Sequence, residues 1–166
     1  MSTAVSNPPS SPLSSSVANS VCQRGFCVAI AAASAFLYWD LVWPNGGLIA
    51  LDGESAYVLR DQYFAVRRSS LFTDPGDVRV GTRNSVPGLR ASAFLSPDGE
   101  RLTLVLLDIG DEAQSVTLDL GELAGRGSDV YQTEFDPGQS RLWTELGALD
   151  DALDLPTRVV TTVVVR

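Results

Sequence analysis

The second half of the chain consists of short segments in which apolar and polar residues alternate, and no helical pattern interrupts them. Alternation with a period of two places successive side chains on opposite faces of a β-strand. Turn-forming motifs such as SPDG, DIGDE and DPGQ separate the segments. Short strands joined in this way are typical of an antiparallel β-sandwich of the Ig-like or Greek-key type. The predicted strands cover residues 79–82, 89–96, 101–109, 114–120, 129–135 and 158–165.

The first half of the chain has a different pattern. Residues 1–21 are rich in Ser and Pro and carry no charged side chain. Such a segment cannot bury enough apolar surface to offset the entropy of ordering, so we predict disorder there. For residues 22–77 we predict a helix over 22–33, a buried strand over 35–42, a turn over 43–47, a short hairpin-like element after it and a helix over 57–72.

The predicted helix over 57–72 has an apolar face and an arginine-rich face, and the motif DPGD at 74–77 ends it. We expect the apolar face to turn inward, with Val58, Tyr63, Val66 and Phe72 on it. On the opposite face we expect Arg60, Arg67 and Arg68 to remain in solvent.

The apolar run GFCVAIAAASAFLYW, residues 25–39, allows two interpretations. It is shorter than the roughly 20 residues that span a bilayer, and Asp40 closes it, but a signal anchor stays open as an alternative. A continuous apolar strand after a helix is typical of a parallel sheet covered on both faces, as in a (β/α)₈ barrel. Cys22, three residues before this run, and Cys27 within it are expected to be small buried residues, with a disulfide or redox role as the alternative. The sequence indicates no cellular location.

Composition excludes several kinds of chemistry. The chain has neither His nor Lys, so it has no Ser-His-Asp triad, no His-containing zinc site and no Schiff-base lysine. Its 20 acidic and 12 basic side chains give a net charge of −8, which disfavours nucleic acid as a partner. We therefore expect no cofactor and no metal, and any chemistry must come from carboxylates.

Four blocks of sequence resemble glycoside hydrolase family 30. SAFLYWDLVWPNGGLI is similar to the family's eighth barrel strand and its loop, and DQYFAVRRSSLFTDPGDVRV to its last barrel helix and the run into the sandwich. ASAFLSPDGERLTLVLLDIGDEAQSVTLDL and LPTRVVTTVVV are similar to its sandwich strands. In the second block Tyr63 and Phe64 stand for a Tyr-Tyr pair, and the matching residues are Ser70, Phe72, Pro75, Gly76 and Arg79.

The resemblance implies a (β/α)₈ barrel joined to a C-terminal β-sandwich and the hydrolysis of β-glycosidic bonds with retention. It divides this chain into a tail (1–21), a barrel remnant with the end of helix seven, strand eight and helix eight (22–77), and a sandwich (78–166). Two departures are tolerable: Ser69 replaces an aromatic residue, and Val159 replaces a Ser. The family's two catalytic glutamates follow the fourth and seventh barrel strands, and no residue of this chain matches either motif. The resemblance therefore assigns no catalytic residue.

Three residues are candidates for contact with a sugar. Trp39 takes the place of a Trp at the floor of the family's sugar site, and its alternative is a core indole. Asp40 could hydrogen-bond near that site or simply end the strand. Trp43 lies in a loop of the kind that sets substrate selectivity. Its alternative is to cover the mouth of the barrel.

The remaining acidic residues predict no site. The chain's glutamates fall in turns or solvent-facing strand positions, where carboxyl groups keep ordinary pKa values: Glu54, Glu100, Glu112, Glu122, Glu134 and Glu145. The acidic stretches 108–112 and 150–154 lack the regular ligand spacing of a calcium loop.

We therefore expect part of a retaining β-glycosidase or endo-glycanase that is inactive alone. Its expected partners are β-linked carbohydrate and the missing barrel portion. The alternatives are a carbohydrate-binding or interaction sandwich and a membrane-anchored sandwich.

Overall fold

A computed structural model describes residues 41–43, 46–53, 56–135 and 142–166. The predicted tail, the helix over 22–33, both cysteines and all but the last two residues of the strand over 35–42 lie outside these residues. The described chain forms two compact units, one ending at Arg67 and one running from Arg68 to Arg166. The domain division predicted at residue 77, and the barrel origin of 22–77, stay predictions.

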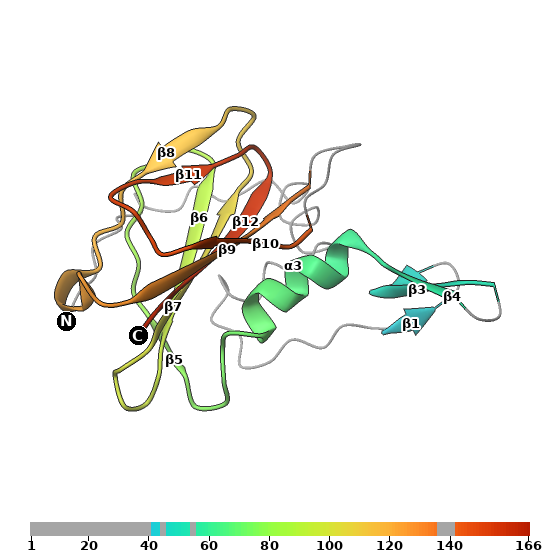
Figure 1. The fold of residues 1–166 in the computed structure, drawn as a ribbon, viewed down its shortest axis with the longest axis horizontal. Helices are drawn as coiled ribbons and strands as arrows, with labels where there is room; N and C mark the ends of the chain where they lie inside the picture. Colours follow the sequence, from blue (N-terminus) through green and yellow to red (C-terminus); the bar gives the residue numbers. More distant parts are fainter. Residues whose placement is uncertain (1–40, 44–45, 54–55, 136–141) are drawn as a thin grey trace, which may run out of the picture. The chain divides into compact units, whose positions relative to one another are not determined.

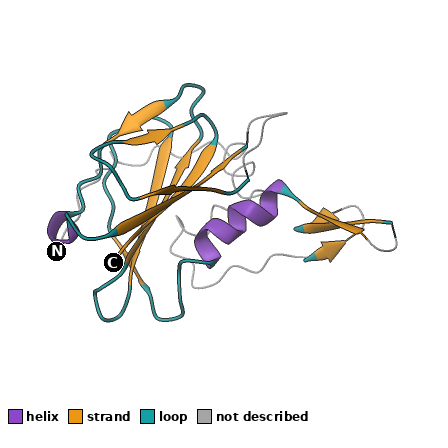
Figure 2. Cartoon of the chain, viewed as in Figure 1, coloured by secondary structure: helices purple, strands orange, loops and turns teal. Residues whose placement is uncertain are grey.

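The larger unit is an antiparallel β-sandwich, which confirms the predicted fold class (Figures 1 and 2). Its main sheet has the order β10-β9-β12-β7-β6-β5, so that β12 lies between β7 and β9. A two-stranded sheet, β8 with β11, packs on one face of it. The strands are β5 (Val78–Val80), β6 (Leu89–Leu95), β7 (Leu102–Asp108), β8 (Gln114–Val116), β9 (Ser128–Glu134), β10 (Thr144–Gly147), β11 (Leu153–Leu155) and β12 (Val159–Val165).

All six predicted strands are present, and their ends differ from the predicted ones by at most four residues. Two short strands, β10 and β11, and a 3-10 turn at Gly121–Leu123 were not predicted. β11 has only three residues, and β10 contains an irregularity in its pairing between Glu145 and Gly147. Such short or interrupted segments give too few alternations to identify a strand from sequence.

One face of the main sheet, called here the apolar face, forms the core. On it the register places Leu104 opposite Val163 and Ala93, and these side chains are buried. Val116 of β8 and Leu155 of β11 complete the same cluster from the small sheet. Burying apolar side chains between two sheets is the main stabilising contribution to such a fold.

The opposite face, called here the hydroxyl face, mixes Val with Ser and Thr. Ser92, Thr103, Thr133 and Thr162 lie on it and are fully buried. Buried hydroxyl groups need hydrogen-bond partners, since leaving one unpaired costs about 1–3 kcal/mol. The partners come from the end of helix α3 (Asp61–Ser70) and from the residues after it.

The last turn of α3 is held on the hydroxyl face by both its side chains and its carbonyl groups. The Thr162 hydroxyl donates to the Arg68 carbonyl at 2.9 Å, and the Thr103 hydroxyl donates to the Phe72 carbonyl at 2.7 Å. The Thr73 hydroxyl donates back to the Ser69 carbonyl at 2.7 Å. Carbonyl groups at the end of a helix have no intrahelical donor, so Thr162 and Thr73 act as its C-terminal cap, while Thr103 holds the turn that follows it.

Arg68 is the one predicted solvent-facing arginine whose position the structure contradicts, because its side chain is 0% exposed. Its Nε donates to the Thr133 hydroxyl at 2.6 Å, and a terminal nitrogen donates to the Gln132 carbonyl. The guanidinium also lies over the Trp143 ring, 3.8 Å from its centroid. These contacts replace the water that the cation loses on burial.

The predicted helix over 57–72 begins later than expected. Residues Ala56–Leu59 form strand β4, paired with β3 (Ile49–Asp52), so the apolar residue Val58 is exposed instead of facing inward. The ladder satisfies the backbone groups of this segment, and α3 starts at Asp61 after it. An acidic residue at a helix N-terminus is favourable because of the helix dipole.

The turn after α3 is joined to the β6–β7 turn through Arg101. Its guanidinium contacts Asp74 at 2.6 Å and Asp77 at 2.8 Å, and the Asp77 side chain is only 3% exposed. Gly76 has a φ of 101°, a conformation that side chains other than glycine rarely adopt. The charge pairs and the glycine fix the route of the chain from α3 into β5.

We predict that Arg68→Met lowers the free energy of unfolding by about 3 kcal/mol. The change removes charged hydrogen bonds and leaves the Thr133 hydroxyl and the Gln132 carbonyl buried without this donor. A urea melt followed by far-UV circular dichroism measures the loss. Arg126→Met is the matched control, because Arg126 forms an exposed pair with Glu100 and should cost less than about 1 kcal/mol. Equal losses of unfolding free energy in the two variants would contradict the stabilising role given to the buried Arg68 side chain.

Candidate carbohydrate-facing site

Of the three predicted sugar-contacting residues, Trp43 is the one that the structure describes. Trp39 and Asp40 lie outside the described residues. Trp43 ends strand β1 (Val42–Trp43), which pairs with β2 (Gly46–Gly47) so that Trp43 lies opposite Gly46. A glycine supplies no cross-strand side chain to cover the indole. Trp43 is accordingly 54% exposed.

The hairpin that carries Trp43 is held by backbone hydrogen bonds. The Leu41 carbonyl accepts the N–H groups of Leu48 and Ile49 at 3.2 and 2.9 Å, and the Arg60 N–H donates to the Leu48 carbonyl at 3.0 Å. Leu48 itself is buried. Of the predicted turn over 43–47, Trp43 belongs to β1 and Gly46 and Gly47 to β2, while 44–45 lie outside the described residues.

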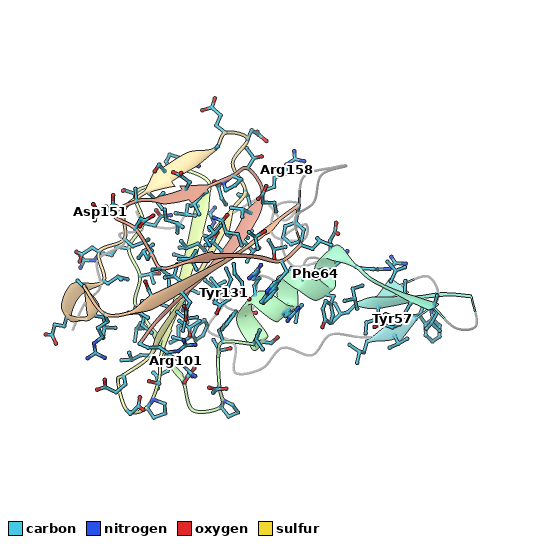
Figure 3. All side chains as sticks on the ribbon, in the orientation of Figure 1. Tyr57, Phe64, Arg101, Tyr131, Asp151 and Arg158 are labelled. Carbon is cyan, nitrogen blue, oxygen red and sulfur yellow. The ribbon has the colours of Figure 1, made fainter. Side chains whose placement is uncertain are left out.

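The small sheet β2-β1-β3-β4 exposes an unusual amount of apolar surface. Tyr57, labelled in Figure 3, is 68% exposed and lies opposite Leu51, which is 47% exposed. The register places Val42, Leu51 and Tyr57 on one face of this sheet and Trp43 and Val58 on the other. Exposed apolar surface marks contact sites for a ligand or for further polypeptide. The exposed residues on this sheet and just before it are Leu41, Val42, Trp43, Leu51, Tyr57 and Val58.

Most glutamates of the described residues lie in solvent, and Glu54 lies outside those residues. Glu100, Glu112, Glu122 and Glu145 are exposed, as the sequence predicts, and Glu134 is half-buried at the end of β9. The pKa of Asp98 is lowered below its ordinary 3.8, first by a hydrogen bond from the Ser96 hydroxyl and then by the Glu100 N–H. A lowered pKa keeps the group ionised, whereas an acid catalyst needs a raised pKa.

The acidic stretch 108–112 has a structural role. Asp108 is buried and accepts the Gly110 N–H at 2.8 Å, so it shapes the turn that leads to β8. The Gln114 amide also donates to the Asp108 carboxylate, at 3.4 Å. Among the residues that the structure describes, no group of His, Cys, Asp or Glu is arranged to hold a metal ion.

The sandwich contains a cluster of aromatic side chains whose contact the sequence did not predict. Phe72 and Tyr131 stack with centroids 4.6 Å apart, and Trp143 lies 5.8 Å from Tyr131 (Figure 3 labels Tyr131). Arg68 covers the Trp143 ring. Because Phe72 comes from the chain after α3, the strand pattern gave no signal that these rings would meet. The rings are used in packing against one another and against a cation, so they present little free surface for a sugar.

The part of the chain that the structure describes contains no helix long and apolar enough to cross a membrane. The apolar run 25–39, on which the membrane alternative rests, lies outside that part.

Comparison with solved structures identifies similar folds. The catalytic domain of the GH30 xylanase C from Talaromyces cellulolyticus is 24% identical, with a TM-score of 0.73 over 99% of this chain. A conserved exported protein from Bacteroides fragilis is 21% identical, with a TM-score of 0.70 over 96% of the chain. A GH30 endoxylanase from Clostridium papyrosolvens is 18% identical, with a TM-score of 0.63 over 98% of the chain. The resemblance to family 30 is thereby confirmed at the level of the fold.

These matches cover 38%, 36% and 41% of the respective solved chains, so this chain spans well under half of each. No family model and no curated protein matches the sequence.

We predict opposite effects from removing the two described indoles. Trp143→Ala should lower the free energy of unfolding of the sandwich by about 2 kcal/mol, since the ring contacts Arg68 and two other aromatic side chains. Trp43→Ala should change it by less than about 0.5 kcal/mol, because that indole is largely in solvent. Urea melts of both variants measure the difference. A larger loss for Trp43→Ala would show that its ring packs against the folded core.

Proposed function

We propose that the chain is part of a family 30-like retaining glycoside hydrolase and that it contributes one wall of a sugar site. The supporting observation is the likeness of nearly the whole chain to GH30 xylanase structures. The four sequence blocks agree with it in order and spacing. The exposed indole of Trp43 adds a side chain suited to carbohydrate.

The role of the wall is binding and orientation. A sugar ring has an apolar face of C–H groups, and an indole face stacks on it while the hydroxyl groups bond elsewhere. In this proposal Trp39 forms the floor of the site, Asp40 accepts a sugar hydroxyl and Trp43 flanks the entry. The apolar face of the small sheet that carries Leu51 and Tyr57, opposite to the face of Trp43, then contacts the remaining barrel portion of the enzyme.

The bond-breaking groups come from outside this chain. A retaining mechanism needs two carboxyl groups about 5–5.5 Å apart, one as nucleophile and one as acid and base. The family's glutamates stand on barrel strands four and seven, and no position of this sequence matches them. The chain alone is therefore expected to bind weakly and to leave β-linked glycans intact.

A second candidate function is a carbohydrate-binding sandwich, which the cluster of Phe72, Tyr131 and Trp143 favours. Sugar-binding aromatic residues need free ring faces. Here Arg68 lies over one face of Trp143, and Phe72 stacks on Tyr131. The first proposal is therefore preferred.

We predict that the full 166-residue chain releases no reducing sugar from xylan or β-glucan above a blank without protein. A family 30 xylanase serves as the positive control in the same assay. Saturable release by this chain, abolished by replacing one of its own glutamates, would overturn the assignment of the catalytic groups to other polypeptide.

Pull-down on insoluble xylan and β-glucan separates the two functions. If Trp43 forms part of the sugar site, any retention falls at least about threefold in Trp43→Ala and is unchanged in Trp143→Phe, which keeps an aromatic ring in the cluster. Retention that depends on Trp143 or Tyr131 and ignores Trp43 would support the binding-module function instead.

A further inference from the structure

The sandwich contains a cavity of about 140 Å³ over its apolar face. Its floor is formed by β6 and β7, with Ala91 and Ala93 beside Leu104 and Leu106. Residues 82–86, between β5 and β6, form one wall, and residues 116–120, at and after the end of β8, form the other. The cavity lies entirely within the larger unit and includes none of the sugar-site candidates.

The cavity arises because the second sheet covers only part of the apolar face. The second sheet has two short strands, and β8 ends at Val116. Beyond that point irregular chain replaces a strand over β6. The two alanines of β6 face this region, while their partners across the ladder, Leu106 and Leu104, are large. The small side chains leave a space that a strand with larger residues would fill.

One wall of the cavity is fixed by hydrogen bonds. The Asn84 side-chain amide donates to the Leu89 carbonyl at 2.8 Å, and its oxygen accepts the Val86 N–H at 2.8 Å. The Thr82 hydroxyl donates to the Ala91 carbonyl at 3.2 Å. Because these bonds tie the loop to β6 independently of any ligand, the cavity is formed in the free protein, and binding needs little ordering.

The lining defines the chemistry of a ligand. The floor is aliphatic, whereas the rim carries polar groups, among them Arg83, Ser85, Thr117 and Asp119, which are exposed. An enclosed aliphatic cavity of about 150 Å³ holds benzene, and this one has a similar volume but is open to solvent at its polar rim. A ring of that size would rest on the leucines and alanines, and one polar substituent would reach the rim.

We propose that this cavity is a binding site for a small monocyclic aromatic molecule, such as a phenol, with the ring on the floor and the hydroxyl group at the rim. The site is separate from the sugar wall and does not depend on the proposed hydrolase function. Affinity comes from burying the ring against Leu104 and Leu106.

Thermal melts of the full chain with benzene and with phenol test the proposal. We expect both probes to raise the melting temperature with saturable dependence on concentration, because each binds the native state only. Ala91→Leu places a larger side chain in the cavity and should weaken binding at least about tenfold. Ala113→Leu is the matched control, because Ala113 is exposed in the turn before β8 and its variant should bind as the original chain does.

Methyl NMR of the unmodified chain gives a result that does not depend on the variants folding. Benzene should shift the methyl signals of Leu104, Leu106 and Leu118 and leave those of Val160 and Val164, on the hydroxyl face, unchanged. Unshifted cavity methyl signals at millimolar probe, or equal stabilisation of the original chain and Ala91→Leu, would overturn the proposal.

Discussion

The buried guanidinium of Arg68 fixes the last turn of α3 on the hydroxyl face of the sandwich. A cation removed from water is costly unless other groups replace its hydration, and here a hydroxyl, a carbonyl and an indole face do so. Those groups come from β9 and the segment leading into β10. In this structure one placement of the end of α3 satisfies all three. The segment from Arg68 to Thr73 is therefore an integral part of the sandwich.

This constraint explains why the two faces of the main sheet differ. On the apolar face β12 presents Val159, Val163 and Val165, with the buried Thr161 between them. The hydroxyl face must also satisfy the carbonyl groups at the end of a helix, and it does so with Thr103 and Thr162. Both faces are buried, which is why β12 reads as a nearly continuous apolar run with two threonines in its middle.

The sequence predicts the sandwich well because alternation is a local signal, and the strands β6, β7, β9 and β12 are each seven residues long. It predicts Arg68 wrongly because helix periodicity identifies a polar face without showing what covers it. The stack of Phe72 on Tyr131 is likewise set by packing across 59 positions of sequence, the difference between 131 and 72. Exposure of Trp43 follows from its glycine partner in β2, which becomes clear only when the register is known.

The proposed function assigns different roles to the two units of the chain. The sandwich is a self-sufficient unit that holds the end of α3, and the exposed apolar sheet with Trp43 is the part suited to contact a sugar and further polypeptide. Residues that bind can lie on this chain, while the carboxyl pair that cleaves lies elsewhere in the proposed enzyme.

Native-state hydrogen exchange tests most directly whether the end of α3 belongs to the sandwich. The account predicts that the amide groups from Ser69 to Thr73 open with the same free energy and the same urea dependence as those of β12, such as Val163. Exchange of Ser69 to Thr73 that is orders of magnitude faster, while β12 stays protected, would contradict it.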